Sequence, residues 1–174
     1  MSEYNIEFSE KLIDCAKLVK VDPIDVFEAK RTVVYLSKLS CEIILKALLE
    51  KAGKPIKEIR GHSHNLIKLL DELCWCQIKK DIRGGDLRWV SASDVRSKIV
   101  DKRYSDATIG HVLSGEKFGA SKYPNIRYGD QFTDFPLELI LKAAIVLLNW
   151  AKKYWDSIRV LKTHNEFLMN LGSK

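Results

Sequence analysis

A long stretch of helical periodicity near the N-terminus constrains the fold more than any other feature. From Ile24 to about Ala52, small and apolar residues recur every three or four positions, as they do on the packed face of an α-helix. This face contains Ala29, Val33, Leu36, Ser40, Ile44, Ala47 and Leu48. A helix of this length is not stable through its own propensity and needs packing partners along it. The pattern therefore predicts a helical bundle built around this segment.

Three further segments also have apolar residues at helical spacing. They are residues 5–20, a segment that starts near Ser63, and a segment that runs from about Asp134 to Ile158. Residues 91–103 are typical of a short polar helix, Gly84 and Gly85 mark a turn, and strand signals are nearly absent. We therefore expect a single all-α domain over residues 1–174, built on two long helices packed together, with an irregular insertion at 105–134 before the last helix.

Charge and hydropathy argue against export and membrane insertion. The first residues, MSEYNIEFSEK, are acidic and lack the apolar core of a signal peptide. The most apolar stretch is interrupted by Glu138 and Lys142, so it is not a clean membrane-spanning helix. We expect a cytoplasmic protein with no membrane contact. Four cysteines in 174 residues do not indicate a disulfide framework.

Residues of the types that bind zinc occur at His62, His64, Cys74 and Cys76. Cys74 and Cys76 are two positions apart on a predicted helix and so point in different directions, whereas zinc sites use wider pairs. The sequence contains no glycine-rich phosphate loop and no Ser-His-Asp set. We therefore expect neither a metal site nor a cofactor.

Three motifs, in the order in which they occur, resemble those of one family. SCEIILKALLEKAGK, which begins at Ser40, is similar to a long-helix pattern with a glutamate two positions after a small residue. GHSHNLIKLLDEL is similar to a Gly-His-Asp-Leu-x-x-Leu-Leu signature, with His64 as the matching histidine and Asn65 in place of aspartate. IRYGD is similar to an Arg-Tyr-x-acidic element that precedes the final helix. Together they resemble the HEPN family of "higher eukaryotes and prokaryotes nucleotide-binding" helical domains.

The resemblance implies an antiparallel bundle of four to five helices that pairs as a homodimer. Members of the family act in prokaryotic toxin–antitoxin and phage-defence systems, many of them as ribonucleases. Others are non-catalytic partners of nucleotidyltransferases or bind nucleotides or RNA. The chain is therefore expected to be a binding module for RNA, a nucleotide or a protein partner. The alternatives are a metal-independent ribonuclease toxin and a structural or regulatory dimerisation protein.

The ribonuclease members carry an arginine and a histidine separated by four to six residues. The arginine stabilises phosphate charge and the histidine moves a proton. Arg159 and His164 have this spacing, in RVLKTH. Such a spacing often arises by chance, Val160 stands where the family has a polar residue, and five positions on a helix turn about 500°, so the two side chains do not share a face. The alternative is that both are solvated residues at the end of the last helix.

His64 is the other candidate catalytic histidine, with Arg60 or Arg127 brought near it by the fold. The alternative is a packing histidine that pins its loop to the bundle. Arg127 and Tyr128 belong to the third motif, and we interpret Arg127 as a partly buried residue that organises a polar pocket with Glu42, since a lone carboxylate is costly to bury. The alternative for Glu42 is a surface pair with the lysine four positions later.

A run of basic residues follows the predicted third helix, within a chain of net charge +6. Its cations are Lys79, Lys80, Arg83, Arg88, Arg96, Lys98, Lys102 and Arg103, with Lys117 and Lys122 farther on. Trp89 and Tyr104 lie among them, and Tyr123 follows. Cations hold phosphates and exposed aromatic rings stack on unpaired bases, so this segment is the expected RNA-binding region. The alternative is a solvated face with Trp89 in the core.

Overall fold

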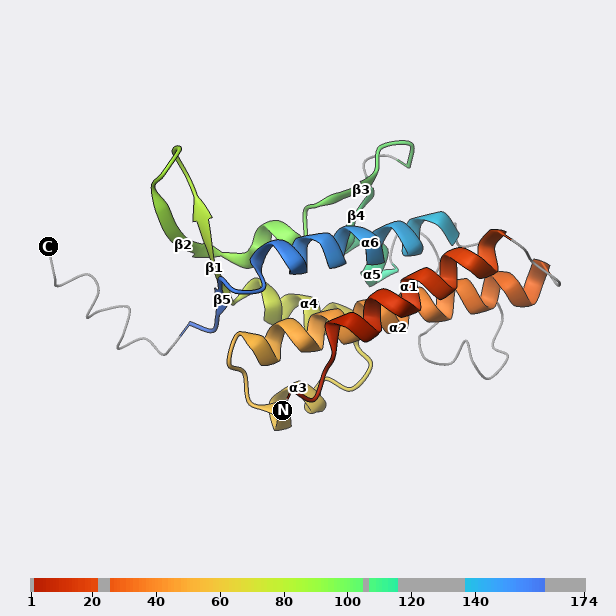
Figure 1. The fold of residues 1–174 in the computed structure, drawn as a ribbon, viewed down its shortest axis with the longest axis horizontal. Coiled ribbons are helices and arrows are strands. Elements are labelled where there is room, and N and C mark those ends of the chain that lie inside the picture. Colours follow the sequence, from red (N-terminus) through yellow and green to blue (C-terminus); the bar gives the residue numbers. More distant parts are fainter. Residues whose placement is uncertain (1, 22–25, 105–106, 116–136, 162–174) are drawn as a thin grey trace, which may run out of the picture.

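Two long helices lie at the centre of the fold and bury much of its core. The computed structural model describes residues 2–21, 26–104, 107–115 and 137–161. The central helices are α2 (Val26–Lys51) and α6 (Leu137–Tyr154), and α1 (Ile6–Val21) packs along α2 (Figure 1). The limits of α2 nearly match those that the apolar periodicity predicts. On the predicted face, Ile44, Ala47 and Leu48 are at most 1% exposed.

Shorter helices pack around this pair. They are α3 (Ile56–Gly61), α4 (Leu66–Cys74) and α5 (Ile109–Ser114). Asn65 caps α4, because its side chain accepts a hydrogen bond from the backbone N–H of Lys68 at 3.0 Å. Leu66, Leu69 and Leu70 of α4 are buried. The segment GHSHN therefore lies before this helix and does not form its first turn.

The all-α prediction is wrong, because the chain also forms two antiparallel sheets. One contains β1 (Gln77–Asp81), β2 (Leu87–Ser91) and β5 (Ile158–Arg159), in the order β2-β1-β5. The other pairs β3 (Ile99–Asp101) with β4 (Ala107–Thr108). The fold is thus a helical core with a small β component, and the β1–β2 hairpin projects from one end of it (Figure 1).

Two glycines explain the hairpin. Gly84 and Gly85 have φ values of 59° and 121°, a backbone that side chains disfavour, and they close the turn between β1 and β2. Asp81 stabilises the turn by accepting hydrogen bonds from the backbone N–H groups of Arg83 and Gly85. The buried Ile78 anchors β1 to the core. The predicted Gly-Gly turn therefore joins two strands.

Other predicted limits also change. The expected polar helix at 91–103 is replaced by a 3₁₀ turn at Ala92–Val95 followed by β3. The last helix ends at Tyr154, and the chain then continues into β5. Within the expected irregular insertion, residues 107–115 form β4 and α5, and 116–134 lie outside the described residues. Among the helices that are described, none has the length and apolar character needed to cross a membrane.

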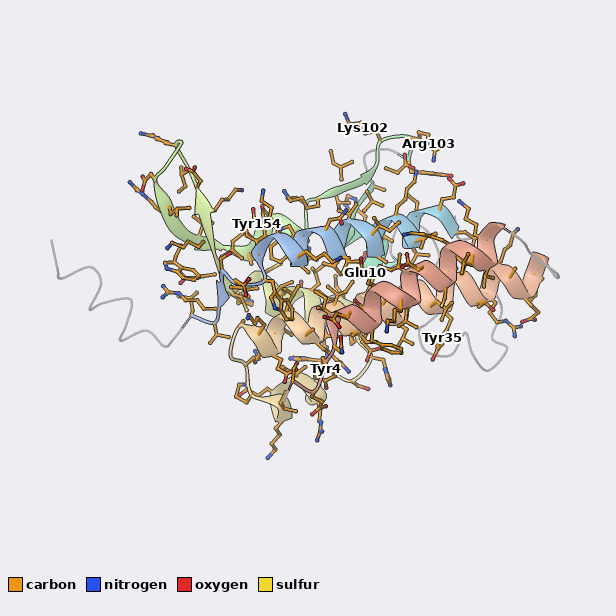
Figure 2. The ribbon with its side chains drawn as sticks, viewed as in Figure 1. Tyr4, Glu10, Tyr35, Lys102, Arg103 and Tyr154 are labelled. Carbon is orange, nitrogen blue, oxygen red and sulfur yellow. The ribbon has the colours of Figure 1, made fainter. Side chains whose placement is uncertain are left out.

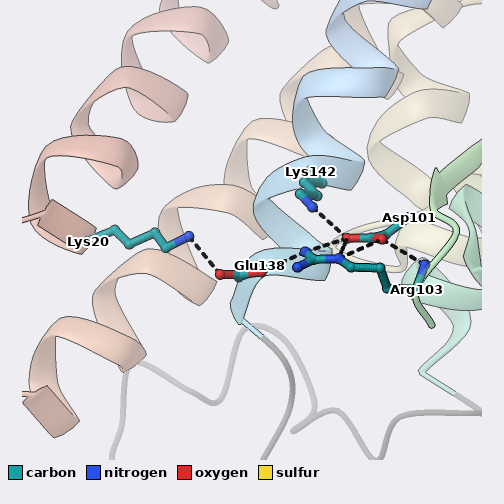
Figure 3. Close-up of polar contacts among 5 residues, drawn as sticks. All are labelled: Lys20, Asp101, Arg103, Glu138 and Lys142. Atoms are coloured by element: carbon teal, nitrogen blue, oxygen red, sulfur yellow. Dashed lines mark hydrogen bonds and ion pairs between the residues drawn. The ribbon is translucent and has the colours of Figure 1, made fainter.

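An ion-pair cluster ties β3 to the helices (Figure 3). The Asp101 carboxylate accepts hydrogen bonds from the Arg103 guanidinium at 2.9 Å and from the Lys142 ammonium of α6 at 2.5 Å. Arg103 also donates to Glu138 at 3.0 Å, and Glu138 pairs with Lys20 of α1 at 3.2 Å. The hydrogen bonds from Arg103 and Lys142 hold the pKa of Asp101 well below its ordinary value.

We expect Asp101→Asn to destabilise the fold at neutral pH and to lose this effect in acid. A carboxyl group whose pKa is lowered by folding stabilises the native state above its unfolded pKa, near 3.8, and this contribution disappears as the pH falls toward the folded pKa. Urea unfolding of both proteins from pH 7 to about pH 2 would measure the difference, which should begin to shrink only below the unfolded pKa of 3.8. The control is Asp156→Asn, since the Asp156 side chain is 89% exposed. An Asp101→Asn difference that stays constant across this range would contradict the expectation.

Candidate functional site

Glu42 is the centre of a buried polar cluster on α2. Its carboxylate accepts a hydrogen bond from the Lys46 ammonium at 2.7 Å, and its two oxygens lie 3.1 and 3.0 Å from Nδ1 of His64. Glu42 and Lys46 are only 4% and 8% exposed. Glu42 thus forms the i,i+4 pair with Lys46 that was the alternative interpretation, but in the interior and not at the surface, and it has His64 as a second partner. Arg127 and Tyr128 lie outside the described residues.

His64 reaches this carboxylate from the loop before α4. Ser63 has a left-handed backbone, with a φ of 51°, which is uncommon for a residue other than glycine, and this turn places His64 opposite α2. Since Nδ1 faces a carboxylate, it carries the proton, and in the neutral ring Nε2 is the hydrogen-bond acceptor. The side chain of His64 is 44% exposed and that of His62 is 20% exposed, so His64 is the more accessible of the two.

The geometry around His64 can support proton transfer, but no described arginine joins it in a catalytic pair. A carboxylate behind an imidazole fixes the orientation and the tautomer of the ring. Arg60, the arginine nearest in sequence, donates to Glu3 at 2.7 Å and is not paired with Glu42. The described residues therefore supply a histidine–carboxylate pair, and Arg127, the other arginine predicted to join it, lies outside them.

A second lysine extends the polar row along α2. Lys38, one turn before Glu42, is 5% exposed, and burial lowers its pKa to about 8. Burial also raises the pKa of the neighbouring Cys41 thiol to about 12, so this cysteine is not a nucleophile. The Lys46 ammonium lies 5.4 Å from the centre of the Tyr4 ring. The residues before α1 therefore pack against the cluster (Figure 2).

The outer face of the three-stranded sheet is the second candidate site. Lys79 of β1 lies opposite Trp89 of β2, and Gln77 of β1 lies opposite Arg159 of β5. The Arg159 guanidinium lies 4.0 Å from the centre of the Trp89 ring and donates to Gln77 Oε1 at 3.1 Å. Trp89 is 37% exposed, whereas Ile78 on the other face is fully buried. We call Gln77, Lys79, Trp89 and Arg159 the Trp89 platform.

The Trp89 platform shows where Arg159 and Trp89 lie, and both positions differ from an interpretation made from the sequence. Arg159 is not on the last helix but in β5, where it stacks on an aromatic ring 70 positions earlier in the chain. The helical-wheel argument against its pairing with His164 therefore does not apply, and His164 lies outside the described residues. Trp89 is on the surface, so the alternative interpretation, which placed it in the core, is wrong.

Most cations in the described part of the predicted basic run are paired with carboxylates of the same chain. Arg88 pairs with Asp86, Arg96 with Asp71, Arg103 with Asp101 and Glu138, and Lys80 and Lys98 both with Asp94. Over the described part of the run, Lys79, Arg83 and Lys102 make no ion pair.

These residues also do not form one surface. Figure 2 shows Lys102 and Arg103 beyond β3, away from the β1–β2 hairpin. Tyr104 is partly buried against the core and does not present an open ring. The basic run is therefore divided between separate parts of the molecule, and only Lys79 and Trp89 of it belong to the platform.

The described residues contain no group of three His, Cys, Asp or Glu side chains placed to hold a metal ion. Cys15, Cys41, Cys74 and Cys76 are free thiols.

The chain matches no known protein-family model, no curated protein and no solved structure. The resemblance to the HEPN family therefore stays a prediction from the three sequence motifs.

Proposed function

We propose that this chain is an RNA-binding module that holds unpaired RNA on the Trp89 platform. The observation that carries the proposal is the guanidinium of Arg159 stacked on the exposed ring of Trp89, at 4.0 Å, on the solvent side of the sheet. Unpaired bases stack on aromatic rings and on arginine planes, and this interaction tolerates any base. A surface tryptophan with a guanidinium over its ring offers such a base an aromatic and a cationic partner side by side.

The charges beside the ring also favour RNA. Lys79 lies directly across from Trp89 and has no ion pair within the described residues, so its ammonium can contact a phosphate without breaking a salt bridge. Arg159 is hydrogen-bonded only to the neutral Gln77 among the described residues and keeps its charge uncompensated. Few cations are involved, so the proposal is a stacking site with weak phosphate contacts, not an extended basic groove.

Equilibrium binding of fluorescent RNA tests this function. We expect a single-stranded oligonucleotide to bind more tightly than the same sequence in a duplex, whose stacked bases cannot reach the platform. With about two or three phosphate contacts, affinity should fall only about tenfold between roughly 50 and 200 mM salt. Equal binding of duplex would contradict the proposal. An absence of RNA binding at low salt would favour the purely structural or dimerisation role.

The proposal also includes the compartment, oligomeric state and biological system that the sequence and its resemblance to the HEPN family predict. The module acts in the cytoplasm, as a homodimer, in a prokaryotic toxin–antitoxin or phage-defence system. A protein of the nucleotidyltransferase type is the expected partner.

The contact between Glu42 and His64 favours a second candidate function, metal-independent RNA cleavage. General acid–base catalysis contributes roughly a hundredfold or more, so His64→Ala would lower a cleavage rate measured in chelator by at least about that factor. His62→Ala is the matched control and His164→Ala tests the predicted Arg-x4-His pair. If the wild-type protein does not cleave RNA, or if His64→Ala cleaves it at the same rate, His64 has no catalytic role.

A further inference from the structure

A small cavity lies where α4 leads into β1 and where β5 ends. Its volume is about 200 Å³, and it is lined by Lys54, Glu72, Trp75, Cys76, Val160 and Leu161. Val160 is held in place by a hydrogen bond from its backbone N–H to the carbonyl of Ala52 at 2.8 Å. The cavity walls therefore come from three separate segments of the chain that the fold brings together.

Trp75 forms an open wall of this cavity. It follows the last residue of α4 and is 74% exposed, the highest value among the large apolar side chains that are described. An indole ring exposed to this extent contributes little to the core, so its stability role is small. Leu161, 49% exposed, supplies a second apolar wall. A flat ring inserted here would stack on Trp75 and cover apolar surface on both sides.

The remaining wall of the cavity has a hydrogen-bond donor beside a hydrogen-bond acceptor. Lys54 donates to Glu72 Oε2, and Glu72 Oε1 is 3.8 Å from Nε2 of His62, which is too long for a hydrogen bond. Oε1 thus has no hydrogen-bond donor within the described residues. An acceptor therefore lies beside an ammonium donor at the edge of an apolar cavity. A ligand that fits both has a flat face and an edge with neighbouring donor and acceptor atoms.

We propose that this cavity binds the purine base of a nucleotide, stacked on Trp75 with its polar edge toward Glu72 and Lys54. A purine has the flat face and the adjacent donor and acceptor that the cavity complements, and its two rings cover more of the indole than a pyrimidine does. An aliphatic peptide side chain would fill the apolar part but would make no hydrogen bond to Glu72 or Lys54. The cysteine wall is inert, because burial raises the pKa of Cys76 to about 11.

Calorimetric titration of the full chain with mononucleotides tests this inference. We expect AMP and GMP to bind at least about tenfold more tightly than CMP and UMP, and ribose 5-phosphate not to bind, since stacking provides most of the affinity. Trp75→Ala should weaken AMP binding about tenfold or more, whereas Trp75→Phe should keep most of it. Glu72→Gln should weaken AMP binding while leaving the fold intact, because Glu72 is at the surface end of the cavity.

Phe8→Ala is the control, since it removes an exposed aromatic ring that lies on α1, outside both the cavity and the Trp89 platform, and should leave AMP affinity unchanged. The inference is overturned if AMP does not bind, if ribose 5-phosphate binds equally well, or if Trp75→Ala has no effect. It does not depend on RNA binding to the Trp89 platform. AMP binding that requires Trp75, in a protein that binds no RNA, would support the cavity and refute the platform.

Discussion

Replacing Glu42 with leucine is expected to destabilise the fold by about 3 kcal/mol, the largest effect that we predict for a single substitution. The substitution removes the carboxylate that neutralises Lys46, whose side chain is only 10% exposed, and takes a hydrogen-bond partner from His64. An uncompensated buried ammonium costs far more than the pair gains. Urea unfolding at pH 7, followed by circular dichroism, would measure the loss.

Two further variants separate the buried charge from the side chain itself. In the double variant Glu42→Leu, Lys46→Leu, no charge is left uncompensated, so most of the lost stability should return. Asp14→Leu removes the carboxylate of another helical pair, with Lys17, whose side chains are 60% and 51% exposed. That change should alter stability by less than about 0.5 kcal/mol. If Glu42→Leu and Asp14→Leu lowered the free energy of unfolding equally, burial of the Glu42–Lys46 pair would not explain the predicted loss.

The largest functional effect is expected for Trp89→Ala. Removing a ring on which a base stacks costs roughly 1–3 kcal/mol, so affinity for single-stranded RNA should fall by about tenfold to a hundredfold. Arg159→Lys keeps the positive charge but removes the planar guanidinium, so we expect it to weaken RNA binding. A role through charge alone would leave the affinity unchanged. Anisotropy of a labelled oligonucleotide measures both.

Phe8→Ala is the control for Trp89→Ala. Phe8 is 50% exposed and belongs to α1, which contributes no residue to the Trp89 platform. It tests whether any exposed aromatic residue contributes to RNA affinity. We expect no change in affinity. A similar loss in Phe8→Ala and Trp89→Ala would indicate nonspecific association and would contradict a defined platform.

The helices could be predicted from the sequence because their signals are local. Apolar residues at three- and four-residue spacing span α1, α2 and α6, and Asn65 provides a cap for α4. The strands were missed because they are short and because few of their residues alternate between buried and exposed positions. In β2, for example, only Val90 is partly buried and the other residues are exposed. The pair Gly84–Gly85 was the one available signal, and two alternating runs on either side of it are typical of a hairpin.

The candidate sites depend on contacts that local patterns do not encode. Glu42 and His64 are 22 positions apart, and the motif resemblance singled out both without indicating that they touch. The contact of Arg159 with Trp89 depends on the pairing of β5 with β1. Because β5 has only two residues, no periodic pattern in the sequence predicts it. The basic run looked like one surface because charges were counted along the chain, whereas the fold places carboxylates such as Asp94 and Asp71 beside them.

Ultraviolet cross-linking of bound single-stranded RNA, followed by mass spectrometry of the digested protein, tests where RNA lies. The cross-linked peptides should contain Trp89, with Arg159 as the second position, and the signal should disappear in Trp89→Ala. Cross-links confined to the loop around His64, with none on β2 or β5, would contradict RNA binding on the Trp89 platform.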